Sequence, residues 1–267
     1  MALDEILAQT NTNKQTKSTT TKTFVCTIDG GASTGKGTTA KLLSKLLECY
    51  HLDTGALYRT VTYATVQNGI SPDDEDKIVE MLQNNDPETG IKFEFDENKK
   101  QHNCFAGKDL HEEIRSEDFA SVVTRVSKHK NVRAILRKLV RDFVKKNDCV
   151  VEGRDVGKVV LPDADMKYYV TADPYVATWR RMHQENIPPI AFATAFSQVT
   201  TRNQTDAKNL APGEGVVFID ITEHTPLITA EEAAARLIER HPSKREQVTK
   251  NLVVMREQMS GAPMNKA

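Results

Sequence analysis

The stretch Phe24-Val-Cys-Thr-Ile-Asp-Gly-Gly-Ala-Ser-Thr-Gly-Lys-Gly-Thr38 joins an apolar run to a glycine-rich turn and the start of a helical pattern. The β-branched run predicts a buried strand, and the apolar spacing within Lys36–Glu48 predicts an amphipathic helix. Between them, Gly30–Lys36 has the spacing G-x-x-x-x-G-K. Glycines let backbone N–H groups converge on phosphate oxygens, the helix N-terminus adds positive potential, and the lysine reaches the terminal phosphates. The stretch therefore predicts a strand, a loop and a helix that together bind phosphate.

The alternation of apolar strands and helical segments returns further along the chain. Strands are predicted at Cys149–Gly153, Met166–Ala172 and Gly215–Ile221, with helix-like segments between them. Strands of a parallel sheet are buried on both faces, so they read as continuous apolar runs of this kind. The sequence therefore predicts an α/β fold with a parallel sheet flanked by helices.

A second group of elements interrupts this pattern. Residues 71–85 predict a helix with Ser71 as its cap, and residues 91–107 predict a hairpin around the polar turn DENKK. Two more helices are predicted, around Asp118–Ser127 and Asn131–Lys146. Together these elements predict an insertion within the α/β pattern.

The two ends of the chain differ in character. Residues 11–23 contain no side chain able to anchor a core, so we expect residues 1–23 to form a disordered leader. Near the other end, Thr229 and Glu232 form a capping-box pair that predicts the start of a helix. A further helix is predicted after Pro242.

The charge balance and the cysteine spacing argue against several classes of protein. The chain has 36 Lys and Arg against 37 Asp and Glu, so no basic excess attaches it to nucleic acid or anionic lipid. It has neither an apolar run of roughly 18 to 20 residues nor a secretory signal. The four cysteines are far apart, which indicates buried reduced thiols rather than a zinc site or disulfides. We expect a cytoplasmic monomer with no nucleic-acid or membrane partner and no metal ligands.

Two further segments have features of anion sites. His51–Arg59 predicts a short strand that runs into a helix, with Thr54 as N-cap and Arg59 more than one turn along. This arrangement suits a second phosphate, and the alternative is a capped helix with a surface arginine. Gly153-Arg154-Asp155 follows a predicted strand, at the sheet edge where open α/β folds bind ligands. Its alternative is a turn with a local ion pair.

These segments together resemble the bacterial-type cytidylate kinases. The resemblance covers roughly Phe24–His241, and Arg202 and Asp206 belong to it; its quoted parts are IDGGASTGKGTTAKLL, LDTGALYR, EEIRSEDFASVVTRVSKHKNVR and VVEGRDVGKVVLPDADMKYYVTADP. It implies a P-loop NTPase core over residues 24–240, with a monophosphate-binding insertion at roughly 71–130 and a small lid at roughly 182–205. Residues 241–267 would form a C-terminal helix and tail. The implied reaction is transfer of the γ-phosphoryl group of ATP to CMP or dCMP, with Mg²⁺.

The resemblance also implies a role for individual residues. Those implied for ATP are Gly30, Gly31, Ala32, Ser33, Thr34, Gly35, Lys36, Gly37 and Thr38. Those implied for the phosphate of CMP are Thr54, Arg59, Arg115 and Arg154, for its base Thr124, Arg133 and Asp155, and for its ribose Arg202 and Asp206. The catalytic cations are Lys36, Arg154, Arg180 and Arg181.

The base-reading set is chemically suited to cytosine. Cytosine presents an amino donor at N4 beside acceptors at N3 and O2, so a carboxylate combined with arginine and hydroxyl donors can read that edge and reject uracil. Without the resemblance to the family, Arg115 and Arg133 would be interpreted as solvated arginines on helices rather than as binding residues. The same alternative, an exposed helix face, applies to Arg180 and Arg181.

The chain departs from the general phosphate-loop pattern at Gly37 and from the family's pattern after Arg202. Gly37 stands where a serine or threonine usually touches Mg²⁺, as in the G-K-G-T form of nucleoside monophosphate kinases, so we expect phosphates and water to hold the ion. The family commonly shows Arg-Asp-x-x-Asp and a later arginine, whereas here Asn203 follows Arg202 and the later arginine is missing. Two other functions stay open: a P-loop kinase for UMP, AMP or a non-nucleotide acceptor, and a non-catalytic nucleotide-binding relative.

Overall fold

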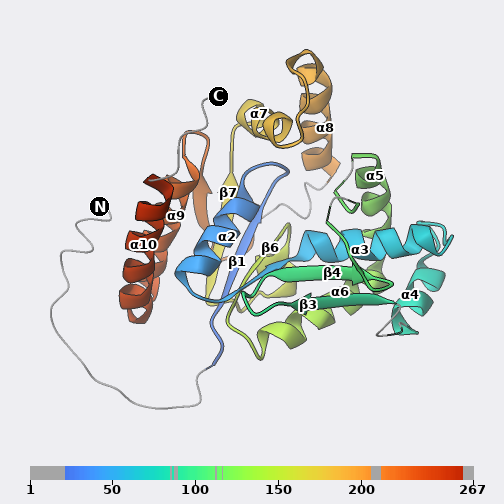
Figure 1. Ribbon diagram of the computed structural model, residues 1–267, viewed down its shortest axis with the longest axis horizontal. Helices are drawn as coiled ribbons and strands as arrows, with labels where there is room; N and C mark the ends of the chain where they lie inside the picture. The colour runs from blue at the N-terminus through green and yellow to red at the C-terminus, as the bar shows by residue number, and fades with distance from the viewer. Residues whose placement is uncertain are drawn as a thin grey trace. The chain divides into compact units, whose positions relative to one another are not determined.

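The chain consists of two compact units. The computed structural model describes residues 22–84, 86, 90–111, 113–115, 117–205 and 212–260. The first unit contains the segment up to Cys49 together with the segment from Asp148 onward, and the second contains Tyr50–Asn147 (Figure 1). The expected insertion, residues 71–130, falls within the second unit.

The first unit is built on parallel strands in the order β6-β1-β7-β8. Each neighbouring pair is parallel, which confirms the predicted sheet. All residues of β1 and β6 are buried, because the sheet is covered on both faces, and this explains their continuous apolar sequence. The strands are β1 (Val25–Gly30), β6 (Cys149–Gly153), β7 (Met166–Thr171) and β8 (Val217–Asp220).

Three helices lie together on one side of this sheet: α2 (Lys36–Leu46), α9 (Pro226–Arg240) and α10 (Arg245–Ser260) (Figure 1). Their buried side chains form one core with those of β1 and β7. Within that core the fully buried Tyr168 hydroxyl donates to the Ala233 carbonyl of α9 at 2.5 Å. The sheet and α9 are therefore joined by a polar contact as well as by apolar packing.

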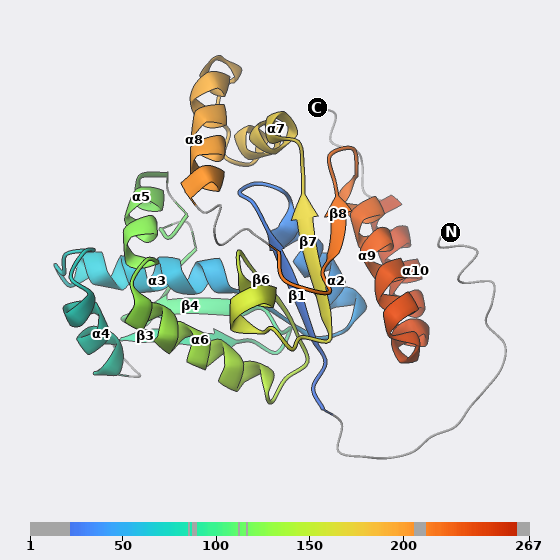
Figure 2. The same cartoon turned by 180° about the vertical axis from the view of Figure 1, so that it is seen from behind.

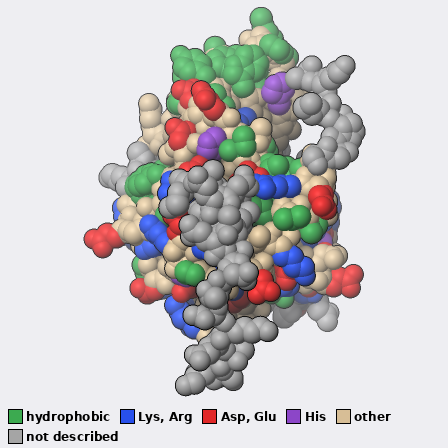
Figure 3. All heavy atoms as spheres, turned by 90° about the vertical axis from the view of Figure 1, so that its left-hand side faces the viewer, with side chains coloured by type: hydrophobic (Ala, Val, Ile, Leu, Met, Phe, Trp, Pro, Cys, Tyr) green, Lys and Arg blue, Asp and Glu red, His purple; other side chains and the backbone are tan. Residues whose placement is uncertain are grey.

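Two further helices of the first unit are held together by aromatic rings. Tyr175 stacks on Phe196 with ring centroids 4.7 Å apart, and Trp179 contacts Phe192 at 5.0 Å. Tyr175 and Trp179 are nevertheless exposed, and Figure 3 shows hydrophobic side chains gathered at the top of the molecule, where these helices lie. The remaining elements of this unit are α7 (Pro174–Gln184), α8 (Phe192–Thr205) and the short helical turns η1 (Val156–Val160), η2 (Pro189–Ala191) and η3 (Pro242–Lys244).

In its described residues, the second unit combines helices, which Figure 2 labels α3 to α6, with an antiparallel sheet in the order β3-β4-β5. The pairing of β3 with β4 confirms the predicted hairpin. Rings of Tyr50, Phe95 and Phe143 cluster beneath it, with Phe95 and Phe143 stacked at 4.7 Å. Its elements are β2 (Tyr50–Asp53), α3 (Thr54–Gln67), α4 (Glu75–Gln83), β3 (Ile91–Phe95), β4 (Gln101–Phe105), β5 (Lys108–Asp109), α5 (Glu117–Val126) and α6 (Lys130–Val144).

Three predicted helix caps are wrong, and in each helix an earlier or later polar side chain takes the role. Asp53 rather than Thr54 caps α3, since its carboxylate accepts from the Ala56 N–H at 3.0 Å. Asp74 rather than Ser71 caps α4, and Thr225 rather than Thr229 caps α9. The Thr229 hydroxyl instead donates to the Thr225 carbonyl from inside the helix. Aspartate and threonine at these positions accept N–H groups of the first turn, which is what a cap requires.

The structure bears on the predictions about the cysteines and about membrane-spanning helices. The four cysteines are free and buried, as predicted. Among the helices in the described ranges, none combines the length and apolar character that crossing a membrane requires.

The contact between α9 and the sheet gives a prediction for stability. Leu237 is fully buried in the core of the first unit, so Leu237→Ala is expected to lower the free energy of unfolding by about 2 to 5 kcal/mol. Urea denaturation of the full chain measures this loss. Val253→Ala on α10 removes a half-exposed side chain and is expected to change stability by less than about 0.5 kcal/mol. Equal effects of the two substitutions would contradict the packing described.

Candidate functional site

The glycine-rich loop between β1 and α2 has a conformation that only glycine permits at two positions. A Cβ on Gly30 would lie 2.4 Å from the Val170 carbonyl oxygen of β7, so the neighbouring strand leaves no room for a side chain. Gly35 caps α2 with a φ of +84°, a left-handed value that favours glycine. The loop therefore turns tightly against the sheet, and the N-terminus of α2 faces the loop. This geometry is suited to binding anions.

The Lys36 ammonium, the Thr34 hydroxyl and the Ala32 amide of this loop have hydrogen-bond partners within the first unit. The Lys36 ammonium donates to the Gly31 carbonyl at 3.1 Å, and the Thr34 hydroxyl donates to the same oxygen. The Ala32 N–H donates to the Asn203 side-chain oxygen of α8 at 2.9 Å. A phosphate oxygen bound at the Ala32 amide would therefore take the place of Asn203, a residue to which sequence reasoning gave no role.

A buried carboxylate lies beside the loop, and sequence reasoning missed it. A Cβ on Gly37 would lie 3.1 and 3.2 Å from the carboxylate oxygens of Glu152, which is 6% exposed at the end of β6. This contact accounts for the glycine where a hydroxyl residue is usual, because a side chain there would press on the carboxylate. The available signal was a charged residue inside an otherwise apolar strand.

The carboxylate of Asp29 joins the end of β1 to the turn that follows β6. It accepts from the Val156 N–H at 2.8 Å and from the Gly157 N–H at 2.7 Å. Burial raises the pKa of Asp29 to about 6, although the two N–H donors and the Lys36 charge act in the opposite direction. Gly157 is required here, because a Cβ would lie 2.6 Å from the Thr27 hydroxyl.

This junction positions Arg154 and Asp155 at the carboxyl edge of the sheet. They lie between the end of β6 and η1, directly before the two amides that Asp29 binds. Asp155 is buried, and its charge helps to raise the pKa of Asp29, on which Lys36 also acts. The charges of Lys36 and Asp155 therefore both act on the pKa of Asp29. Arg154 is half-buried, and its charge opposes the rise that burial causes in the pKa of Tyr169.

Arg180 and Arg181 of α7 make contacts inside the first unit. Arg180 donates to the Ile221 carbonyl at 2.7 Å and to the Thr222 carbonyl at 3.2 Å, and burial lowers its pKa. Arg181 is buried and donates to the Glu185 carboxylate one turn along, at 3.0 Å. Their catalytic assignment stays a prediction, and it requires these guanidinium groups to exchange such contacts for a phosphoryl group.

Of the two residues expected near the ribose, Arg202 lies in the last turn of α8. Arg202 is half-buried and immediately precedes Asn203, whose side chain contacts the loop. Asp206 lies outside the described residues. The rings that fix α8 on α7 therefore also fix the position from which Asn203 reaches the Ala32 amide.

In the second unit, Thr54 and Arg59 lie in the first two turns of α3. Thr54 is the first residue of the helix and is buried, while Arg59 is half-buried. The side chain of Asp53 accepts the Ala56 N–H there, so one amide of this helix N-terminus already has an acceptor. The helix dipole still favours an anion at this end.

Arg133 and Thr124 lie at the corner where α5 leads into α6. The Arg133 guanidinium is 5.9 Å from the ring centroid of Tyr58, and it donates weakly to the Ser127 carbonyl at 3.4 Å. The Ser127 hydroxyl in turn donates to the Thr124 carbonyl. Arg115 is exposed in the turn before α5. Within this unit, the contacts bring Arg133 beside α3, next to the residue that precedes Arg59.

The chain is similar to known proteins over most of its length. Residues 26–241 match the family model described as cytidylate kinase. The chain is 34% identical over 219 residues to the cytidylate kinase of Geobacillus sp. (strain WCH70), covering 79% of this chain and 93% of that protein. It is 41% identical over 160 residues to that of Pediococcus pentosaceus, covering 60% and 68%. It is 33% identical over 219 residues to that of Carboxydothermus hydrogenoformans, covering 79% and 94%.

The raised pKa of Asp29 predicts how stability depends on pH. Because the folded-state pKa of about 6 exceeds the ordinary value of 3.8, the unfolded chain releases this proton first as pH rises. The free energy of unfolding should therefore fall by about 2 kcal/mol from this group between pH 4 and 7. The free energy of unfolding of Asp29→Asn is expected to lack this part of the pH dependence. Any loss of stability from the missing carboxylate acceptor is a constant amount, which does not change with pH.

Urea denaturation at several pH values measures the difference between the two curves. Asp163→Asn, which alters an exposed carboxyl in the same unit, serves as the control and should follow the wild-type curve. Parallel curves for wild type and Asp29→Asn would contradict the buried, late-titrating carboxyl.

Proposed function

The chain belongs to the cytidylate kinase family, and from that premise we propose that it transfers the γ-phosphoryl group of ATP to CMP or dCMP, giving ADP and CDP or dCDP. The observation that carries this proposal is that Asp29, at the end of the strand leading into the Lys36 loop, binds the two amides directly after Arg154 and Asp155. A phosphate-binding cation and a base-reading carboxylate there belong to adjoining parts of one site. The enzyme is a phosphotransferase whose acceptor is itself a phosphate.

The donor ATP would bind at the loop Gly30–Thr38. Backbone amides of the loop and the α2 N-terminus would hold its β- and γ-phosphates, and Lys36 would leave the Gly31 carbonyl to bind them. Asn203 would release the Ala32 amide at the same step. Both exchanges replace a neutral oxygen acceptor by a charged one, which makes stronger hydrogen bonds.

The acceptor nucleotide would use the remaining set. Thr54, Arg59, Arg115 and Arg154 would bind the phosphate of CMP, since guanidinium groups match phosphate oxygens bidentately. Thr124, Arg133 and Asp155 would read the cytosine edge, Asp155 accepting from the N4 amino group. Arg202 and Asp206 would contact the ribose.

The chemical step asks for position and charge rather than for covalent participation. The attacking atom is a phosphate oxygen of CMP that already carries negative charge, so no general base is needed. The two nucleotides must lie in line with water excluded, and cations must face the charge that develops on the transferring group. Lys36 and Arg154 would supply that charge, joined by Arg180 and Arg181 after they exchange their present partners.

The residues around the loop fit Mg²⁺. The buried Glu152 carboxylate beside Gly37 is an oxygen donor of the type this ion prefers, directly or through water. With Gly37 in place of a hydroxyl residue, Glu152 and the Thr38 hydroxyl would hold the ion's water shell. When bound, Mg²⁺ would neutralise charge on the phosphates of ATP.

An acceptor panel tests the proposed function. Purified full chain is assayed with ATP and Mg²⁺ against CMP, dCMP, UMP and AMP, with ADP formation coupled to a spectrophotometric readout. We expect turnover of CMP or dCMP to exceed that of UMP and AMP by at least about 100-fold, because uracil leaves the base-reading carboxylate unpaired. Faster turnover of UMP or AMP would assign another acceptor, and ATP binding without any transfer would assign a non-catalytic relative.

Two substitutions separate the donor and acceptor roles. Lys36→Ala is expected to lower kcat by at least about 100-fold with a small change in the KM for CMP, because Lys36 acts on charge in the transition state. Asp155→Ala is expected to raise the KM for CMP by about tenfold or more and that for ATP little. Lys45→Ala at the exposed end of α2 is the control and should match wild type. Equal loss of both substrates in Asp155→Ala would contradict its assignment to the base.

A further inference from the structure

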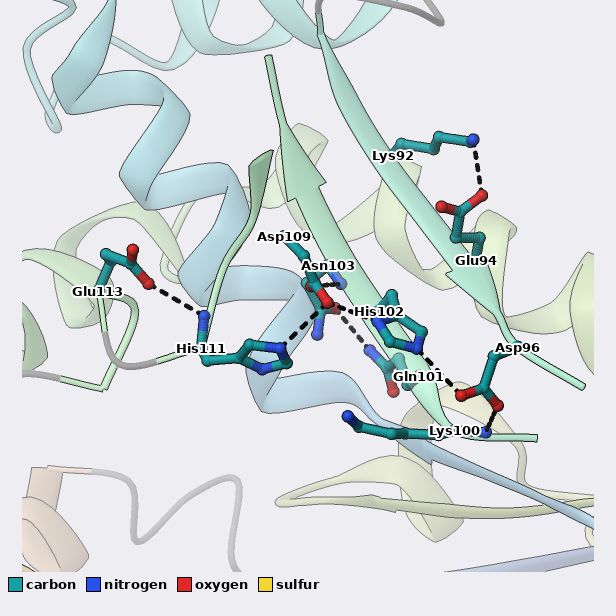
Figure 4. A network of polar contacts seen from close by, with 10 residues as sticks. All are labelled: Lys92, Glu94, Asp96, Lys100, Gln101, His102, Asn103, Asp109, His111 and Glu113. Carbon is teal, nitrogen blue, oxygen red and sulfur yellow. Dashed lines mark hydrogen bonds and ion pairs between the residues drawn. The ribbon is translucent and has the colours of Figure 1, made fainter. Parts of the chain in front are cut away.

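Two histidines and an aspartate meet on one face of the β4–β5 pair in the second unit, and the proposed reaction uses none of them. The register pairs Cys104 with Asp109, and the Leu110 N–H donates to the Asn103 carbonyl. Continuing that register places His102 opposite His111. Since side chains alternate between faces, His102, Asp109 and His111 share one face, and Figure 4 shows both imidazole rings directed at the Asp109 carboxylate.

The nitrogen atoms of the two rings converge on the same oxygen. His102 Nδ1 lies 2.5 Å from Asp109 Oδ2, and His111 Nε2 lies 3.0 Å from that atom. One ligand atom from each of the three residues lies within 4.8 Å of the other two. Two imidazoles and a carboxylate make a ligand set that late first-row divalent metals prefer, while Mg²⁺ and Ca²⁺ prefer oxygen ligands alone.

Neighbouring groups orient two of the three side chains. His102 Nε2, on the far side of the ring from Asp109, lies 3.3 Å from the Asp96 carboxylate. Asp96 itself accepts from the Asn98 and Lys100 amides at 2.9 Å. The second oxygen of Asp109 accepts from the Asn103 amide at 3.2 Å. A carboxylate that binds the outer nitrogen of a histidine fixes the tautomer that offers the inner nitrogen to a metal.

We propose that His102, Asp109 and His111 form a binding site for one divalent transition-metal ion, with Zn²⁺ as the preferred ion. His102 would bind through Nδ1, His111 through Nε2 and Asp109 through Oδ2. Ligand atoms of a tetrahedral zinc ion with bonds of about 2.0 to 2.2 Å lie about 3.3 Å apart. The two histidine nitrogens lie 2.5 and 3.0 Å from Asp109 Oδ2, so binding an ion would require these separations to widen slightly.

Solvent exposure leaves room for the ion and for a fourth ligand. The side chains of His102 and Asp109 are 24% and 30% exposed, and that of His111 is 56% exposed. Water can therefore complete the coordination. Bound metal would join β4, β5 and the segment after them, so its direct effect is to stabilise the second unit rather than to take part in phosphoryl transfer.

Metal titration of the full chain tests this site. Protein freed of metals with chelator, without nucleotide, is titrated with Zn²⁺ by calorimetry, alongside His111→Ala and the matched control His183→Ala, whose histidine is exposed on α7. We expect the control to bind as wild type does and His111→Ala to bind at least about tenfold more weakly at one site. Asp96→Asn, which disturbs only the orienting carboxylate, should weaken binding by about 10 to 100-fold.

Two further measurements test metal binding without calorimetry. Co²⁺ in place of Zn²⁺ should give visible ligand-field bands in wild type that are absent from His111→Ala. Saturating Zn²⁺ should raise the melting temperature of wild type and of His183→Ala, but not that of His111→Ala. Equal zinc affinity in wild type and His111→Ala, or binding of Mg²⁺ as tight as that of Zn²⁺, would overturn the proposal and leave a hydrogen-bonded surface cluster.

Discussion

The buried carboxylate of Asp29 joins the carboxyl ends of two neighbouring strands in the first unit. It stands at the end of the central strand β1 and accepts the two amides that open η1, so the ends of β1 and β6 are joined at one point. A carboxylate with so little water around it is costly to ionise, and burial accordingly raises its pKa to about 6. The cost is offset by two backbone hydrogen bonds and by the nearby Lys36 ammonium. As a result, Arg154 and Asp155 lie directly before a turn that these hydrogen bonds fix in place.

At the same edge of the sheet, close packing leaves room only for glycine at several positions. Gly30 is imposed by the Val170 carbonyl, Gly157 by the Thr27 hydroxyl and Gly37 by the Glu152 carboxylate. Two of these three glycines, Gly30 and Gly37, belong to the loop proposed to bind phosphate. Asn203 belongs to the same pattern, because its side chain reaches the Ala32 amide from α8. The Lys36 ammonium and the Ala32 amide both have partners in the first unit, and a phosphate has to compete with those partners.

The second unit contains two groups of polar contacts, and only the first includes residues expected to bind the acceptor. Arg133, Ser127 and Thr124 are linked at the corner of α5 and α6. The His102, Asp109 and His111 cluster lies on the small sheet, and its order rests on Asp96 and the hairpin turn that holds it. A metal there would act on the stability of this unit, so its presence or absence is separable from the identity of the nucleotide acceptor.

The sequence alone determined the strand, loop and helix around Lys36, the parallel sheet and the hairpin, because these depend on spacing and burial periods that neighbouring residues carry themselves. It also placed the family, since the motifs recur in order along the chain. Helix caps were predicted less well: Thr54, Ser71 and Thr229 lost that role to Asp53, Asp74 and Thr225, because several nearby polar side chains compete for the same amides. Only the tertiary structure brought Asp29 to Val156, Glu152 to Gly37, Asn203 to Ala32 and His102 to His111. Such contacts depend on which strands pair and in what register, and no local pattern encodes the distance between two segments that meet only after folding.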